Sequence, residues 1–160
     1  MESITTDRTV DEGKFLTFVL SNEEYGIEIL KVREIIGIIG ITPVPQTPNY
    51  LKGVINLRGK VIPIIDLRLK FSLPEEEYTQ ETCIIVVEVH NAQIGVVVDK
   101  VFEVIDIKRQ DLEETPQFGQ EMDTNFIMGL GKVKEKIIIL LDIDKVLLSE
   151  ESEMIDELTK

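Results

Sequence analysis

The residues that could carry out chemistry in this chain are few, and their types exclude several kinds of active site. The 160 residues include a single cysteine, Cys83, and a single histidine, His90. An internal disulfide, a thiolate metal cluster and a multi-histidine zinc site are therefore impossible. Cys83 opens the apolar run 84–87, which favours a buried, inert thiol over a nucleophile. General acid–base chemistry by a carboxylate, with Glu34 or Glu103 as the acid or base, remains open.

A second chemically distinctive feature is an arginine inside an apolar run. Residues 53–68 read GVINLRGKVIPIIDLR, and Arg58 and Gly59 stand near the middle. The pattern predicts a β-hairpin whose turn uses Gly59, because glycine adopts a positive φ without steric cost. The hairpin gives no reason for Arg58, and on this pattern alone a solvated turn residue is the simplest interpretation.

Composition and charge limit the classes of function. The chain is 43% hydrophobic and 29% charged, as soluble globular proteins are, and is long enough for one domain or two small ones. The net charge of -13, without a basic stripe, argues against a nucleic-acid partner. No apolar run approaches the roughly 20 residues of a membrane helix, and the acidic start is unlike a signal peptide. We expect a cytoplasmic protein, without membrane insertion, whose residues 1–14 form a flexible tail.

The elements that must position these residues are mainly strands. Runs of β-branched residues separated by turn residues predict an all-β barrel or sandwich: 15–20, 53–57, 60–67, 83–89, 94–99 and 136–143. Helix signals are few. Short helices are predicted after Asp66 and Asp142, which would act as N-caps, and an amphipathic helix is predicted over residues 149–160. Residues 29–36 fit either a helical turn or a strand.

Alignment of the chain on itself indicates a duplication. A shift of 69 positions puts residues 15–36 on residues 84–105, and seven further residues in the second half put 53–67 on 129–143. The matched polar and glycine positions are Gly26 with Gly95, Lys31 with Lys100, Glu34 with Glu103, Gly53 with Gly129, Lys60 with Lys136, and Asp66 with Asp142. The order of these matches predicts two halves of about five short strands, each able to form a small barrel.

The duplication separates framework positions from positions that are free to differ. The matched glycines and aspartates are expected to set turn geometry and helix caps. In contrast, Arg58 and Gly59 are replaced by Lys134 and Glu135 in the second half. The repeated fold therefore does not require the arginine. A seam between two equivalent barrels is a natural position for a groove.

Three segments resemble the CheW chemotaxis adaptor family: residues 23–35, 50–71 and 95–105. Their G-V-x-N-L-R-G-x-V-x-P-x-x-D-L-R signature is long, and the resemblance extends over residues 15–148. It implies a mainly β fold of two pseudo-repeated, five-stranded, SH3-like β-barrels with a hydrophobic core between them. The first barrel repeat would cover about 15–71 and the second about 83–146, with or without exchange of strands.

The resemblance also implies partners. Family members couple the cytoplasmic helical tips of methyl-accepting chemoreceptors to the regulatory domain of the histidine autokinase CheA, without catalysis, cofactor or metal. Pairing of one adaptor barrel with one barrel of that domain lets adaptor and kinase alternate in rings at the inner face of the membrane. A groove at the barrel seam is implied to accept the receptor's helical hairpin, as an apolar face in an apolar slot.

Carried over to this chain, the resemblance implies a receptor-binding groove made by Val32, Glu34, Arg58, Val101 and Val104. Arg58 would make a charge-assisted hydrogen bond to a receptor carboxylate, with a geometry that lysine matches less well. An ion pair between Arg58 and Glu34 in the free protein is equally admissible. The three valines could equally be core residues.

The kinase-binding candidates are Ile38, Ile39 and Ile41, in an apolar stretch that we expect to be exposed. The alternative function is a small-ligand-binding barrel or a carboxylate-dependent enzyme, which paired acidic groups in a cleft would support. An open apolar groove without such groups would support the adaptor. The absence of kinase motifs favours a freestanding adaptor over a piece of the kinase.

Overall fold

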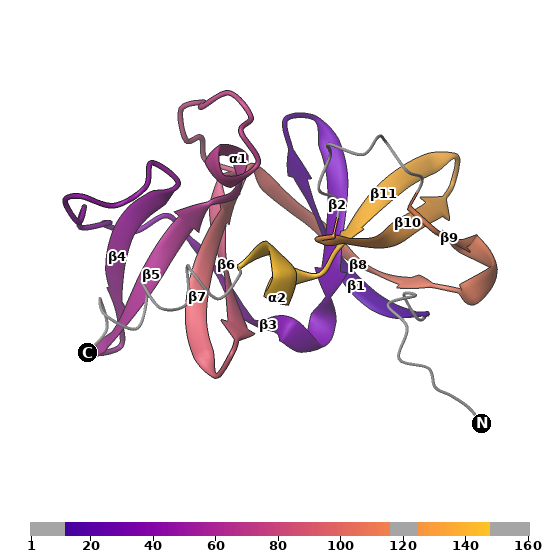
Figure 1. Cartoon of the computed structure of the whole chain (residues 1–160), viewed down its shortest axis with the longest axis horizontal. Coiled ribbons are helices and arrows are strands. Elements are labelled where there is room, and N and C mark those ends of the chain that lie inside the picture. The colour runs from indigo at the N-terminus through magenta and orange to yellow at the C-terminus, as the bar shows by residue number, and fades with distance from the viewer. Residues whose placement is uncertain (1–11, 116–124, 148–160) are drawn as a thin grey trace.

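The computed structural model describes residues 12–115 and 125–147, which form strands and a few helical turns (Figure 1). The strands are β1 (Gly13–Leu20), β2 (Glu23–Glu28), β3 (Val32–Gly37), β4 (Leu51–Leu57), β5 (Lys60–Asp66), β6 (Cys83–Val89), β7 (Ala92–Val98), β8 (Lys100–Ile107), β9 (Leu112–Glu113), β10 (Ile127–Val133) and β11 (Lys136–Leu141). The helical turns are η2 (Ile29–Lys31), α1 (Leu67–Lys70), η3 (Arg109–Asp111) and α2 (Ile143–Val146). The predicted strand runs all fall on strands, and the ambiguous segment 29–36 divides into η2 and β3.

The strands form two sheets, named here sheet A and sheet B, which lie side by side with α2 between them (Figure 1). Sheet A has the order β8-β1-β2-β11-β10-β9, and sheet B has the order β3-β6-β7-β5-β4. Sheet A exceeds the expected five strands only by the two-residue β9. The first half of the repeat gives β1 and β2 to sheet A but β3, β4 and β5 to sheet B. The halves therefore exchange strands, and neither sheet is built from one half alone.

The backbone repeats itself in the two halves. Four hairpin turns have a positive φ at both central residues, the combination that matches the twist of a hairpin. The turn at residues 21–22 is equivalent to that at 90–91, and the turn at 58–59 to that at 134–135. This agreement extends the duplication from the sequence to the turn geometry, even where the residue types differ.

Gly26 and Gly95 are framework positions, although not for the turn geometry that we expected. Gly26 pairs with Leu140 where β2 and β11 run parallel, and Gly95 pairs with Ile64 where β7 and β5 run parallel. A Cβ on Gly26 would lie 3.1 Å from Leu140 Cδ2, and one on Gly95 would lie 2.6 Å from Ile64 Cδ1. Glycine thus leaves room for a side chain of the adjacent strand at the two parallel junctions between the halves.

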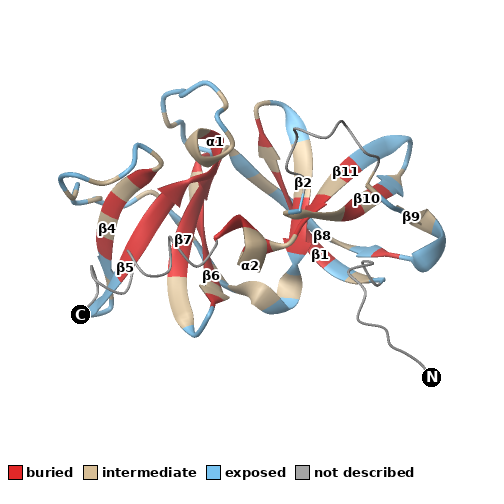
Figure 2. Ribbon diagram, viewed as in Figure 1, coloured by how far each residue is buried: buried red, intermediate tan, exposed pale blue. Residues whose placement is uncertain are grey.

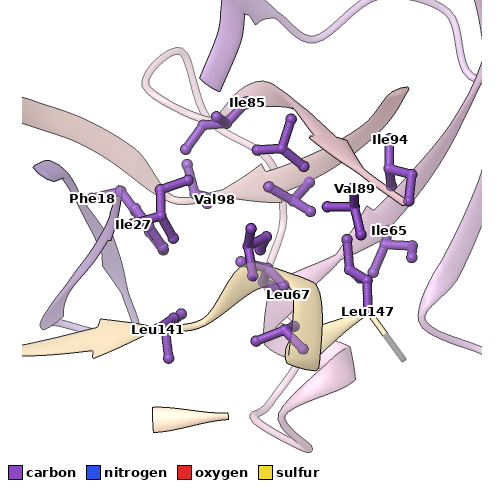
Figure 3. Packing of buried hydrophobic residues seen from close by; sticks show 14 of the residues in the cluster. Phe18, Ile27, Ile65, Leu67, Ile85, Val89, Ile94, Val98, Leu141 and Leu147 are labelled. Atoms are coloured by element: carbon purple, nitrogen blue, oxygen red, sulfur yellow. The ribbon is translucent and has the colours of Figure 1, made fainter. Parts of the chain in front are cut away.

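Three clusters of buried side chains hold the fold together. The central cluster lies between the sheets and includes side chains from both sheets, α1 and α2; Figure 3 labels ten of its residues. A smaller cluster fills the inside of each sheet, made in sheet B by Ile55, Ile62, Ile64, Ile84, Val86 and Val97, and in sheet A by Phe15, Ile107, Ile138 and Leu140. β6 and β7 face the central cluster on one side and the inside of sheet B on the other (Figure 2). Burial on both faces explains their continuous apolar sequences.

Both short helices begin at an aspartate, as predicted. Asp66 Oδ1 accepts hydrogen bonds from the backbone N–H groups of Arg68 at 2.9 Å and Leu69 at 3.4 Å. Asp142 Oδ1 accepts one from the backbone N–H of Lys145 at 3.3 Å. These caps start α1 and α2 directly after β5 and β11, so that both helices pack into the central cluster.

The ends of the chain are described only in part. β1 begins at Gly13, inside the segment that we expected to be a tail. Residues 1–11 and the helix expected over residues 149–160 lie outside the described residues. Within the described ranges, no helix is long and apolar enough to cross a membrane.

Replacement of Gly95 by alanine tests the close approach of the two halves. The new Cβ would lie 2.6 Å from Ile64 Cδ1 and 2.7 Å from Ile84 Cγ2, so that buried side chains must shift. We expect Gly95→Ala to lower the free energy of unfolding by about 1–3 kcal/mol in urea denaturation. The control is Gly37→Ala, where nothing lies within 4 Å of the new Cβ. Its effect should stay below about 0.5 kcal/mol, and equal losses at the two sites would contradict this account.

Candidate partner-binding surfaces

The turn between β4 and β5 holds Arg58 in a backbone conformation that arginine rarely adopts. Arg58 has a φ of 53° and Gly59 a φ of 84°, and the Gly59 N–H donates to Asn56 Oδ1 at 2.8 Å. The sequence explained a positive φ at Gly59 but missed the one at Arg58. The left-handed region costs a residue with a side chain about 1 kcal/mol, which glycine avoids and asparagine lessens. The local backbone therefore does not favour arginine here.

Arg58 forms an ion pair with Glu34 on β3, so the pairing that the sequence left open is confirmed. The pair links the β4–β5 hairpin, at one end of the strand order of sheet B, to β3 at the other end. The Arg58 side chain remains 70% exposed and that of Glu34 31% exposed. Ion pairs in such exposed positions contribute about 0–1 kcal/mol to stability. The pair therefore orients the guanidinium at the surface without adding much to the stability of the fold.

Val32 and Val101 occupy equivalent positions in the two halves and pack against the same cluster. Val32 begins β3 and Val101 is the second residue of β8. Both side chains are partly buried against the central cluster. The alternative that they are core residues therefore holds in part, since each also keeps an exposed portion at the seam between the sheets.

Val104 is exposed and has an exposed counterpart. Val104 on β8 and its repeat equivalent on β3, Ile35, are 49% and 44% exposed. The same relation joins Val61 and Ile137, the second residues of β5 and β11, which are also exposed. Each sheet therefore carries apolar side chains at matched outer positions. The two shifts identify these pairs in the sequence, but nothing in the sequence indicates that they are exposed.

The predicted kinase-binding stretch is only partly exposed, which corrects the expectation for two of its three isoleucines. Ile39 is exposed. Ile38 and Ile41 are partly buried and pack against the cluster inside sheet B. The segment after β3 covers this cluster, because the backbone of Thr42 bridges to Val54 on β4. Ile39 is therefore the residue of this stretch that is best able to contact a partner.

Two clefts lie at the seam between the sheets. One, of about 470 Å³, has the Arg68–Asp99 ion pair and Phe102 in its lining. The other, of about 420 Å³, is lined by charged residues and by Leu30, the most exposed of the large hydrophobic side chains that the structure describes. None of the five predicted receptor-binding residues lines either cleft. Glu103 also lines neither cleft, so these clefts contain no pair of Glu34 and Glu103 that could act as acid and base. Nothing in the sequence indicates that Leu30 and Phe102 are exposed.

Cys83 is only partly buried, which corrects the expectation of a buried thiol. Burial raises the pKa of the Cys83 thiol, against a smaller opposing contribution from a hydrogen bond with the Val101 backbone, so the thiol stays protonated at neutral pH. The Glu34 carboxylate is engaged by Arg58. Over residues 12–115 and 125–147, no group of three or more His, Cys, Asp or Glu side chains could hold a metal ion.

Comparison with known proteins identifies the family. A family model described as the CheW-like domain matches residues 14–151. The chain belongs to the CheW family. The chemotaxis protein CheW of Klebsiella aerogenes is 43% identical over 147 residues, which cover 92% of this chain and 89% of that protein. The chemotaxis protein CheW of Helicobacter pylori is 42% identical over 135 residues, 84% of this chain and 81% of that protein.

A solved CheW structure agrees with the fold. The scaffolding protein TtCheW from Thermoanaerobacter tengcongensis matches with a TM-score of 0.79 at 35% identity, over 88% of this chain and 95% of that chain. The two pseudo-repeated β units are therefore those of the CheW fold. CheW proteins are non-catalytic scaffolds of chemotaxis, so the chain is a chemotaxis adaptor and not an enzyme. The alternative of a ligand-binding barrel is not favoured, because packed side chains fill the inside of both sheets.

Arg58→Asn tests whether the fold needs the arginine. Asparagine tolerates the φ of 53° better than arginine, and only an exposed ion pair is lost. We expect the free energy of unfolding in urea to change by less than about 1 kcal/mol, or to rise. A larger loss would mean that the Arg58–Glu34 pair is part of the framework.

The raised pKa of Cys83 predicts slow thiol chemistry. Because only the thiolate reacts, labelling by a disulfide reagent at pH 8 should be at least about tenfold slower than for a free cysteine peptide. The rate should recover in denaturant, where the thiol regains the pKa of an exposed cysteine. Equal rates for the native protein and the peptide would contradict the assignment of an inert, partly buried thiol.

Proposed function

We propose that this chain couples the cytoplasmic helical tips of methyl-accepting chemoreceptors to the regulatory domain of the histidine autokinase CheA. It would act in the cytoplasm, at the inner face of the membrane, where receptor arrays hold it. Its family membership supports a chemotaxis adaptor as the general role. The identities of the partners and of the contact residues are the parts of this proposal that need a test.

The exposed Arg58–Glu34 pair is the observation that carries the receptor assignment. The local φ does not favour arginine, and the equivalent turn in the second half is built from Lys134 and Glu135, whose φ values of 52° and 66° are also positive. The fold therefore does not require an arginine at this turn. A guanidinium that Glu34 holds at the surface is pre-oriented for a bidentate contact with a carboxylate of a partner helix.

Two partly exposed valines, which neither cleft includes, support an apolar contact with a receptor helix beside that pair. Val32 precedes Glu34 on β3, and Val101 is its equivalent on β8. Both side chains rest on the central cluster and keep an exposed portion. They offer apolar contacts from both sheets, while the neighbouring Arg58–Glu34 pair would fix the register of a docked helix.

Repeat-related apolar residues on the two sheets support assembly with the kinase. Ile35 and Val61 on sheet B correspond to Val104 and Ile137 on sheet A, and all four are exposed. We thereby reassign Val104 from the receptor groove, where the resemblance placed it, to this surface. An adaptor with a similar surface on each sheet can contact one kinase domain on each side, which is what an alternating ring requires. On sheet B, we assign Ile39 to the kinase-binding surface, next to the partly buried Ile38 and Ile41.

The receptor contact is tested with Arg58→Asn in a pull-down with receptor tip fragments. Loss of a charge-assisted hydrogen bond should weaken binding about tenfold or more. The matched control is Lys134→Asn, which makes the same exchange at a turn position with a φ of 52° in the other half. We expect that control to bind like the parent protein. Unchanged binding of Arg58→Asn, or equal losses in both variants, would disprove the assignment.

The kinase contact is tested with Ile39→Asp, which places a charge on the exposed position of the stretch. We expect weaker binding to the CheA regulatory domain, by about tenfold, and little change in binding to receptor tips. Both affinities are measured by titration calorimetry on a variant whose circular dichroism matches that of the parent. A greater loss for the receptor than for the kinase would mean that the two faces have been exchanged.

A further inference from the structure

The two halves of the chain are interlaced, and this has consequences beyond the adaptor role. We define the first half as residues 13–71, the connector as residues 72–81 and the second half as residues 82–147. Four strand junctions join the halves: β1 with β8, β2 with β11, β3 with β6, and β5 with β7. Pairings inside one half are limited to neighbouring strands, such as the hairpins β1–β2 and β6–β7.

Neither half has a hydrophobic core made only of its own side chains. The cluster inside sheet B takes Ile55, Ile62 and Ile64 from the first half and its other buried members from the second. The cluster inside sheet A takes only Phe15 from the first half. Ion pairs cross between the halves as well, since Lys31 Nζ lies 2.7 Å from Asp144 Oδ2 and Lys136 Nζ lies 2.7 Å from Glu24 Oε1. Each half therefore presents a complementary surface to the other.

The connector contributes two partly buried side chains to these contacts, Leu73 at the central cluster and Tyr78 at the cluster inside sheet B. None of its residues is fully buried. It is held mainly to the first half, by Arg68 Nη1 donating to the Glu76 carbonyl at 2.9 Å and by the Tyr78 hydroxyl donating to Asp66 Oδ2 at 3.0 Å. Together with α1, it joins the end of β5 to the start of β6, and β7 lies between these two strands in sheet B. That separation is two strand spacings, about 10 Å, whereas the connector could reach about three times as far.

We propose that the halves form a binding pair that can assemble from two copies of this chain, and that the connector decides between the two outcomes. If two chains exchange halves, every junction, cluster and ion pair between the halves is kept, and only the connector changes its path. A connector of ample length holds the halves of one chain at an effective concentration of about 1 mM, so closure within one chain dominates at micromolar protein. If the connector is too short to join the two assembled halves of one chain, the same contacts form only by exchange with a second copy.

The test is the full chain without residues 72–81. Phe71, which stacks on Tyr25 and Phe126, is then joined directly to the buried Thr82. A single peptide link spans about 3.8 Å, so we expect closure within one chain to require α1 to leave the central cluster, in which Leu67 is buried. We expect light scattering after gel filtration to give twice the mass of the deletion monomer, which lacks ten residues of the 18.2 kDa parent chain, with unchanged far-ultraviolet circular dichroism. The control replaces residues 72–81 by a Gly-Ser sequence of the same length and should remain monomeric.

Zero-length carbodiimide cross-linking distinguishes exchanged halves from two closed chains lying side by side. A mixture of nitrogen-15-labelled and unlabelled deletion chains is refolded together and cross-linked at Lys31–Asp144 and Lys136–Glu24. Exchange predicts cross-linked peptides that join one labelled and one unlabelled segment, whereas the Gly-Ser control gives only unmixed pairs. A folded monomer, a dimer with only unmixed pairs, or a deletion chain that fails to fold would each overturn the proposal, because exchange preserves all contacts between the halves.

Discussion

The packing of the two sheets on one central cluster is the interaction on which the rest of the structure depends. Each sheet alone is small, and its own inner cluster contains only a few buried side chains. β6 and β7 are buried on both faces because they serve the inside of sheet B and the central cluster at once. The helices α1 and α2 close the same cluster, each started by an aspartate cap. The seam next to this cluster exists because the two sheets meet there.

The duplication shows which features of this packing are constrained. Gly26 and Gly95 recur because a side chain from the adjacent strand fills the space beside each. The hairpin turns keep the same pair of positive φ values with different residues, so the backbone and not the side chain is what the fold needs there. Because the turn accepts different residues, arginine can occupy position 58, where it forms a surface ion pair with Glu34. At this turn the backbone conformation is therefore a constraint of the fold, whereas the arginine side chain is not.

The sequence indicated which residues could form the candidate site, but not which of the apolar side chains would be exposed. Arg58 and Glu34 were identified from the sequence, and their pairing was foreseen as one of two possibilities. Ile38 and Ile41 were expected at the surface and instead pack against the inside of sheet B, while Ile39 between them is exposed. Strict alternation would place Ile39 and Ile41 on the same face, so the pattern is decided instead by the course of the chain after β3, where Thr42 bridges to Val54. Leu30 is exposed because η2 spans from one sheet to the other, which apolarity alone does not indicate.

The sequence by itself determined the local elements: the strands through their β-branched runs, α1 and α2 through their aspartate caps, and the hairpin at Gly59 through its need for a positive φ. It also determined the duplication, whose matched positions the structure repeats. Only the tertiary structure decided that the halves exchange strands, so that β2 joins β11 and β7 joins β5. The physical reason is that turn and cap preferences act between neighbours in the chain, whereas strand partners are chosen by burial between distant segments. Apolar strands of similar sequence match one another equally well until packing selects the pairs.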